Sequence, residues 1–247
     1  MDYPNIVLAK FIDRPNRFVA QVVLDQQTVT VHVKNTGRTN ILVNGRTVAL
    51  APATNPKRKT QYDLVAVKTA KGWINIDSQA PNAVVGDGLR QNVIALPGIR
   101  QITLVRPETV YQDARFDFFG TGDGRQPFFL EVKGVTLWHD DVAAFPDAPT
   151  IRGEKHVRDL TDAVYHGYFG YLLFLVQIPD IQVVTINRTT QESLATAIHT
   201  AQAAGVHVLA YGTHVTPGRM TLGQPIPFDL RQPFDLAQAL KEAANQK

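Results

Sequence analysis

Three residues near the middle of the chain have the types and spacing that phosphate chemistry needs. Asp117 is separated by 13 residues from Glu131, and Lys133 stands two positions further on. Residues two apart on a strand share a face, so Glu131 and Lys133 project together. Two converging carboxylates suit a hard divalent cation such as Mg²⁺ (or Mn²⁺). A neighbouring ammonium can orient water and offset charge developing on a phosphate.

The same pattern has a second explanation, because Glu and Lys on one face of an exposed edge strand are common. The flanking residues argue against an exposed edge. They are mostly apolar, which indicates strands in the middle of a sheet, where charges need a compensating reason. The apolar neighbours are Phe116, Phe118, Phe128, Phe129, Leu130 and Val132.

The elements that must position these residues alternate between strands and helices. We expect a hairpin, with strands over 115–119 and 128–137 and a glycine-rich turn over 120–126. Helices are expected over 82–94, 153–167 and 189–205, the last from a Thr189 and Glu192 capping pattern. Apolar strands are expected over 171–176 and 206–211. This alternation predicts an α/β domain.

The first third of the chain has a different pattern. Strands with period-two alternation are predicted over 18–24, 28–33, 47–50, 63–67 and 73–76. About five short strands in roughly 70 residues favour a small barrel of the OB type. We therefore predict an OB-like domain over 1–82, an α/β domain over 83–230 and a helical tail over 231–247.

Charge is distributed unevenly between these parts. Residues 1–82 hold 11 lysines and arginines against 5 acidic residues, whereas residues 83–247 hold 14 against 17. A polyanion such as DNA would prefer the first third. The alternative is that a small domain carries a few extra basic residues by chance.

Several other classes of protein are excluded. The chain has no cysteine, so it has no disulfide framework, thiolate zinc site or cysteine nucleophile. A serine-hydrolase elbow and a Walker-type loop are also absent, and the histidines lack metal-ligand spacing. Without a long apolar run or an N-terminal signal, we expect a cytoplasmic protein with no membrane contact.

The order of motifs along the whole chain resembles that of the sugar fermentation stimulation protein family, SfsA. The motifs are His32–Arg38, Asn55–Lys59, Arg115–Phe118, Glu131–Leu137, Phe145–Ala148, Arg152–His156 and Gly205–Tyr211.

The resemblance implies an N-terminal OB-like barrel followed by a restriction-endonuclease-like domain of the PD-(D/E)xK nuclease type. It also implies sequence-nonspecific DNA binding and a role in regulating sugar use, notably that of maltose. By resemblance, Asp117 and Glu131 are metal ligands, Lys133 is the catalytic lysine and Asp87 is the acidic residue of the preceding helix. Glu108 matches a family glutamate without an assigned role. The predicted nucleic-acid contacts are Lys34, Arg38, Lys57, Arg58, Lys59, Arg152 and Lys155.

The sequence departs from the family pattern at three places. Ile151 stands where relatives usually have glutamate, Thr39 stands where they tend to have methionine, and the tail over 235–247 is an addition. Asp87 itself is shorter than the glutamate that many relatives have.

Three hypotheses remain open at this stage. The first is a metal-dependent phosphodiesterase that acts on single- or double-stranded DNA. The second is a noncatalytic DNA-binding regulator, and the third is an interaction protein unrelated to nucleic acid. Phe18, Tyr62 and Trp73 are candidate base-stacking platforms, with core packing as the alternative. The basic residues of 55–59 have a solvated loop as their alternative, and a homo-oligomer is possible.

Overall fold

The computed structural model describes residues 1–34, 41–55 and 57–245, with side chains given through Glu242. Its first part is a small β-barrel, whose strands are β1 (Val7–Asn16), β2 (Val19–Leu24), β3 (Gln27–His32), β4 (Thr47–Pro52), β5 (Tyr62–Thr69) and β6 (Gly72–Asn75). Strands β1 to β5 form a ring, because β3 pairs with β5 at His32 and Asp63. The predicted OB-type barrel is therefore confirmed. Strand β1 was not predicted.

The second part is built on a sheet of six strands with the order β15-β14-β12-β9-β8-β7. These strands are β7 (Ile102–Tyr111), β8 (Ala114–Gly122), β9 (Pro127–Val135), β12 (Phe169–Val176), β14 (His207–Thr216) and β15 (Arg219–Pro225). Strands β9, β12 and β14 run parallel, and β8 and β9 form the predicted hairpin. The predicted α/β domain is confirmed.

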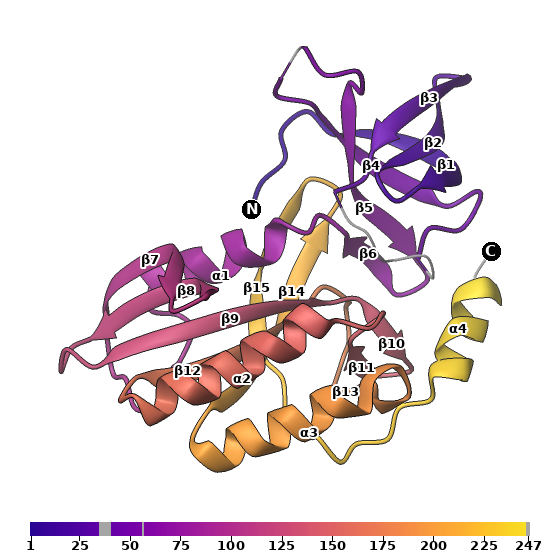
Figure 1. Cartoon of the computed structure of the whole chain (residues 1–247). Coiled ribbons are helices and arrows are strands. Elements are labelled where there is room, and N and C mark those ends of the chain that lie inside the picture. The colour runs from indigo at the N-terminus through magenta and orange to yellow at the C-terminus, as the bar shows by residue number, and fades with distance from the viewer. Residues whose placement is uncertain (35–40, 56, 246–247) are drawn as a thin grey trace.

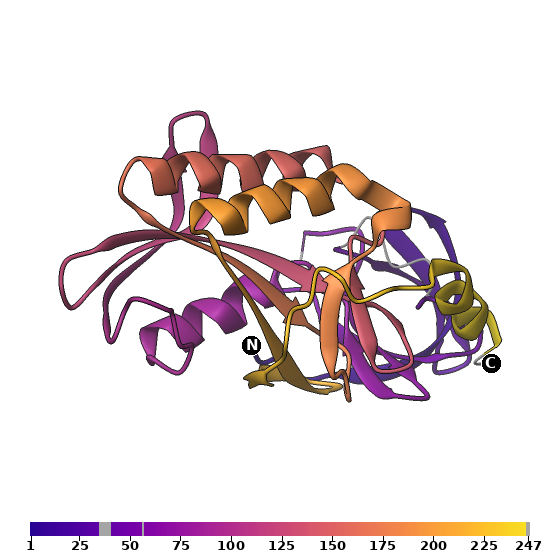
Figure 2. The same ribbon diagram turned by 90° about the horizontal axis from the view of Figure 1, so that it is seen from below.

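Helices cover both faces of this sheet. Figures 1 and 2 show α2 (Ile151–Tyr165) and α3 (Arg188–Ala204) on one face and α1 (Ala80–Arg90) on the other. A smaller sheet of β10 (Leu137–His139), β11 (Val142–Phe145) and β13 (Val183–Ile186) extends the domain, and α4 (Leu236–Asn245) contacts β10. Among the described residues, no helix combines the length and apolarity needed to cross a membrane.

All three helices predicted for the α/β domain start and end at different residues in the structure, and for two of them the cause is local. α1 begins before the predicted 82 because Pro81 fits the first helical turn, and Asn92 lies beyond the helix with a left-handed φ of 56°. The predicted Thr189 cap is wrong, because the side chain of Asn187 accepts the capping hydrogen bond from the Thr190 amide. The predicted left-handed end at Gly205 is confirmed by its φ of 106°.

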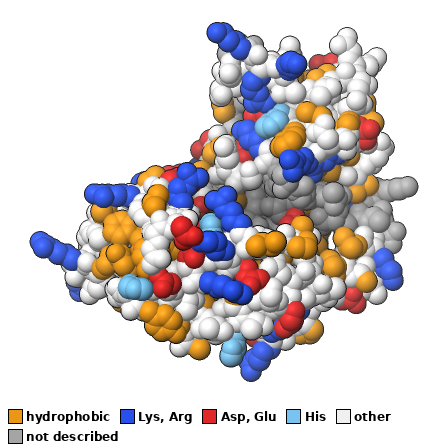
Figure 3. Space-filling view, in the orientation of Figure 1, with side chains coloured by type: hydrophobic (Ala, Val, Ile, Leu, Met, Phe, Trp, Pro, Cys, Tyr) orange, Lys and Arg blue, Asp and Glu red, His pale blue; other side chains and the backbone are white. Residues whose placement is uncertain are grey.

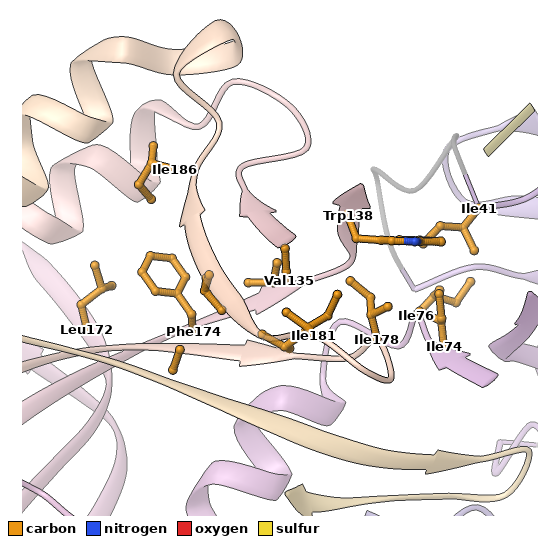
Figure 4. Close-up of a cluster of buried hydrophobic side chains, with 14 of the residues drawn as sticks. Ile41, Ile74, Ile76, Val135, Trp138, Leu172, Phe174, Ile178, Ile181 and Ile186 are labelled. Atoms are coloured by element: carbon orange, nitrogen blue, oxygen red, sulfur yellow. The ribbon is translucent and has the colours of Figure 1, made fainter. Parts of the chain in front are cut away.

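One apolar core runs through both parts of the molecule. Figure 4 shows Ile41, Ile74 and Ile76 of the barrel lying next to Trp138 and Ile178 of the α/β domain. All five side chains are buried. The barrel is therefore held to the α/β domain by hydrophobic burial, which fixes its position relative to the sheet. A second core lies between the sheet and α1.

The beginning of the chain adds a polar connection between the two parts. Met1 and Tyr3 form backbone hydrogen bonds with Met220 and Gly218 at the start of β15. The Tyr3 hydroxyl lies 3.3 Å from the Asp77 carboxylate, and the Asn75 side chain donates to it. The segment that leads from the barrel into α1 is thus anchored on the sheet domain.

Gly120 permits the close approach of β7, β8 and β9. A Cβ at this position would lie 2.3 Å from the buried Phe128 ring and 2.5 Å from the Leu104 carbonyl oxygen. We expect Gly120→Ala to lower the free energy of unfolding by about 2 kcal/mol or more, because neither neighbour can easily move.

Urea unfolding monitored by circular dichroism measures this effect. Gly212→Ala in β14 is the matched control, because its Cβ would lie 3.3 Å from the end of the Ile226 side chain and at an ordinary contact distance of 3.6 Å from the Gln224 carbonyl oxygen. Equal stability losses in the two variants would contradict the packing argument.

Candidate metal centre

Acidic, basic and amide side chains meet in a polar cavity of about 280 Å³. The cavity lies where β7, β8 and β9 meet the beginnings of α1 and α2. The described residues that line it are Ser78, Asn82, Glu108, Arg115, Asp117, Glu131, Val132, Lys133, Thr150, Arg152, Gly153 and His156. Asp117, Glu131, Lys133 and Arg152, all predicted site residues, are therefore brought together.

Asp117 occupies an irregularity in β8. Phe116 packs in the core on the α2 side of the sheet, whereas Phe118 packs in the core on the α1 side. Residues two apart on a regular strand share a face, so the alternation breaks at Asp117. Its Oδ2 accepts a 2.7 Å hydrogen bond from the Val132 amide, and its Oδ1 accepts one of 2.7 Å from Asn82 Nδ2. The carboxylate thereby fills a gap between β8 and β9.

Glu131 lies within β9 and is 3% exposed. Its Oε1 accepts a 2.6 Å hydrogen bond from Lys133 Nζ and also contacts His156 Nδ1. Its Oε2 is buried and has no hydrogen-bond partner among the described residues. An unpaired buried carboxylate oxygen is costly, and a bound cation would offset this cost.

The two carboxylates have pKa values shifted in opposite directions. Burial raises the pKa of Asp117 to about 6, and the charge of Glu131 adds to this shift. Burial also acts to raise the pKa of Glu131, but Lys133 and His156 outweigh it and hold that pKa below its ordinary value. Glu131 is therefore the permanent anion of the pair, while Asp117 gains or loses a proton near neutral pH.

The structure does not bring Asp87 into the cavity. Its exposed side chain pairs with Arg90 on the same helix at 3.2 Å. Asn82 supplies the contact from α1 instead, because residues five apart on a helix point about 140° away from each other. The metal role that the resemblance gives to Asp87 thus has no geometric support.

The barrel residues that were predicted to contact nucleic acid form two groups in the structure. Some are paired with an acidic side chain and others are exposed. Lys34 and Arg58 surround the buried Asp63, with Nζ and Nη2 at 3.1 and 2.7 Å from its carboxylate oxygens. Burial acts to raise the pKa of Asp63, but the hydrogen bonds from Arg58, Lys34 and His32 bring it down to about 2. Lys57 and Lys59 are exposed. Arg38 lies outside the described residues.

The structure also places one predicted nucleic-acid contact of the α/β domain and the three candidate base-stacking residues. Lys155 lies outside the cavity, with its ammonium paired to Asp113 at 3.2 Å and Asp159 at 2.9 Å. Trp73 and Tyr62 are partly buried against apolar clusters, as the packing alternative predicts. Phe18 is half exposed beneath the Arg17 guanidinium.

Comparison with known proteins identifies the family of the chain. Residues 12–76 match the model of the SfsA N-terminal OB domain, and residues 79–219 match that of the sugar fermentation stimulation protein RE domain. A sugar fermentation stimulation protein homologue from Lacticaseibacillus casei is 46% identical over 235 residues, covering 95% of this chain and 97% of that relative. The chain belongs to the sugar fermentation stimulation protein family.

Other members and one solved structure agree with this assignment. The homologue from Enterococcus mundtii is 44% identical to the chain, covering 95% of it and 98% of that relative. The structure of Pyrococcus furiosus SfsA in complex with Ca²⁺ superposes with a TM-score of 0.84 at 22% identity, covering 93% of this chain and 98% of that one. That likeness shows that the family fold is shared.

Several cavity residues had no predicted role in the site, and four of them form side-chain hydrogen bonds or ion pairs with charged residues there. Asn82 and His156 bind the two carboxylates. Glu108, with a left-handed φ of 53° within β7, pairs with Arg115 at 2.8 Å at the edge of the cavity. Arg115 and His156 belong to motifs that carry the family resemblance, so these motifs could have indicated that the two residues belong to the site. The contacts that these two residues make depend on the fold, so the motifs alone do not reveal them.

The raised pKa of Asp117 predicts how stability changes with pH in the absence of metal. A folded-state pKa of about 6, against an unfolded value near 3.8, means that the folded protein binds more protons between these values. Stability should therefore fall as pH rises through this window, by up to about 3 kcal/mol.

Asp117→Asn removes the titrating group, so its stability should lack this decrease. Urea unfolding of wild type and variant at pH 4 and pH 7, in the presence of EDTA, measures the difference. The same pH dependence in both proteins would show that Asp117 is not the group responsible.

Proposed function

We propose that the protein is a metal-dependent phosphodiesterase that acts on DNA. The observation that carries the proposal is the buried, unpaired Oε2 of Glu131 in the same cavity as Asp117. Asp117 and Glu131 would hold Mg²⁺ or Mn²⁺, since oxygen ligands and a partly hydrated site suit these ions. The Ca²⁺ complex of the Pyrococcus furiosus protein supports a divalent ion in this fold.

The ion would supply electrostatic stabilisation of the negative charge that develops on the reacting phosphate. Hydrolysis forms a bond from a water oxygen to phosphorus and breaks the bond to the leaving deoxyribose oxygen, which takes up a proton. Lys133 donates hydrogen bonds, so its ammonium is suited to holding the attacking water and balancing phosphate charge. Arg115 and Arg152 line the same cavity and provide guanidinium groups for the nonbridging oxygens.

The barrel would extend the contact with the nucleic acid. In Figure 3, lysine and arginine side chains lie on both the barrel and the α/β domain, on either side of their junction. Ser78 lines the cavity directly after Asp77, and Asp77 lies 3.7 Å from the barrel residue Lys34. A bound strand would therefore pass from the barrel to the carboxylates over a short distance.

A noncatalytic DNA-binding regulator of sugar (maltose) utilisation is the second candidate. The contact of Asn82 with Asp117 favours it, because α1 contributes an amide to the cavity instead of a third carboxylate. In this case DNA would bind through phosphate contacts without a divalent ion, and the charged cluster would be structural.

Metal titration and cleavage assays separate these two functions. We expect the wild type to bind Mn²⁺ in calorimetry and to shorten single- or double-stranded DNA. Asp117→Asn and Glu131→Gln should weaken Mn²⁺ binding strongly, because each removes one ligand charge. Lys133→Ala should retain metal and DNA binding but reduce cleavage by about 10²-fold or more.

Asp87→Asn is the matched control for these variants, because Asp87 is acidic and exposed outside the cavity. It should bind Mn²⁺ and cleave DNA as the wild type does. DNA binding by a wild type that neither binds Mn²⁺ nor cleaves would support the regulator instead.

The salt dependence of DNA binding tests the predicted phosphate contacts. Each contact contributes about 0.9 to the slope of log K against log salt on duplex DNA and about 0.7 on a single strand. Lys59→Ala should lower the slope by about this amount, because Lys59 is exposed.

Lys155→Ala should change the slope less, since its ammonium already pairs with two aspartates. Fluorescence anisotropy from 50 to 300 mM KCl gives both slopes. An equal loss in the two variants would contradict the distinction between exposed and paired lysines.

A further inference from the structure

We propose that His156 is a positioning residue for the metal ligand Glu131, and that Arg152 fixes the tautomer in which His156 does this. The proposal rests on the proposed metal site and goes beyond it by assigning a role to two residues of α2. No role in a metal centre follows from their sequence positions alone.

The proton positions follow from the donors involved. Arg152 Nε lies 3.3 Å from His156 Nε2, and a guanidinium can only donate. Nε2 must therefore be the acceptor, which places the ring proton of the neutral imidazole on Nδ1. Nδ1 in turn faces Glu131 Oε1, so His156 donates to the carboxylate. The three residues form a directed chain from the exposed Arg152 to the buried Glu131.

This chain determines which oxygen of Glu131 is available. Oε1 accepts from both His156 Nδ1 and Lys133 Nζ, whereas Oε2 is unpaired among the described residues. Donors on one oxygen hold the carboxylate in one orientation and direct the other oxygen toward a cation. Without His156, the Glu131 carboxylate would be held only by Lys133, whose side chain is flexible.

The imidazole is itself held in place by packing. His156 is 7% exposed, and its ring meets the buried Phe116 ring edge-on with centroids 6.3 Å apart. Phe116 lies directly before Asp117 on β8. The histidine thus connects α2 to both strands that carry the carboxylates, and its ring has little freedom to turn.

The experiment measures Mn²⁺ affinity by calorimetry for wild type, His156→Ala, His156→Asn and His166→Ala. Loss of a residue that orients a metal ligand typically costs 10- to 100-fold in affinity, and we expect this loss for His156→Ala. Asparagine places a donor nitrogen the same number of bonds from Cα as Nδ1, so His156→Asn should recover much of the affinity. His166, exposed at the C-terminal cap of the same helix, is the control and should bind as the wild type does.

Each outcome has a separate meaning. A wild type that binds no Mn²⁺ overturns the proposed metal site and, with it, this role. A wild type that binds Mn²⁺, with His156→Ala at the same affinity, overturns the role of His156 alone. Failure of His156→Asn to recover affinity, in a variant that unfolds at the wild-type temperature in EDTA, also overturns it.

A second measurement needs neither activity nor metal. Long-range ¹⁵N–¹H spectra should show the Nδ1–H tautomer of His156 in the wild type and a mixture of tautomers in Arg152→Ala. Mn²⁺ affinity in Arg152→Ala should fall by less than in His156→Ala. An unchanged Nδ1–H tautomer in Arg152→Ala would overturn the role given to Arg152.

Discussion

A buried carboxylate in the middle of a sheet is the constraint on which this structure depends. Glu131 lies on β9 between Leu130 and Val132, which are both apolar and buried. Removing such a charge from water costs several kcal/mol unless donors replace the lost hydration. Lys133 and His156 provide donors for one oxygen. The other oxygen has no hydrogen-bond partner in the part of the chain that the structure describes, and the proposed cation would bind there.

The carboxyl group of Asp117 also lies away from water, but different donors bind its oxygens. Its two oxygens are satisfied by an amide side chain and a backbone amide, both of which are neutral donors. Neutral donors do not fully offset burial and the nearby Glu131 charge, so the pKa of Asp117 stays high. The site therefore holds one anion stabilised by the Lys133 ammonium and the His156 imidazole donor, and one carboxyl group that a divalent ion would deprotonate. This difference is what distinguishes the cavity from a structural ion pair such as that around Asp63.

The sequence predicted those parts of the site that depend on short-range pattern. Residues two apart on a strand must share a face, so Glu131 and Lys133 could be placed together, and the turn over 120–126 brought Asp117 near them. The position of Asp87 relative to the cavity did not follow from a short-range pattern, because the direction of a helical side chain depends on how the whole helix packs. Strand β7 was missed because Pro107 and Glu108 interrupt its alternation. The partner of His156 lies 25 residues away on another element, which no local pattern reveals.

The shared core explains why the barrel contributes to the site at all. Hydrophobic contacts between Ile41, Ile76 and Trp138, together with the Tyr3 connection, leave the barrel little freedom to rotate against the sheet. The segment after β6 is consequently held at both ends, with Asp77 fully buried and Ser78 at the cavity. Any ligand that binds the barrel near Lys34 thus lies at a fixed distance from Asp117 and Glu131. For the proposed function, a rigid spacing of this kind suits a continuous polymer that occupies both regions at once better than a small molecule that fills only the cavity.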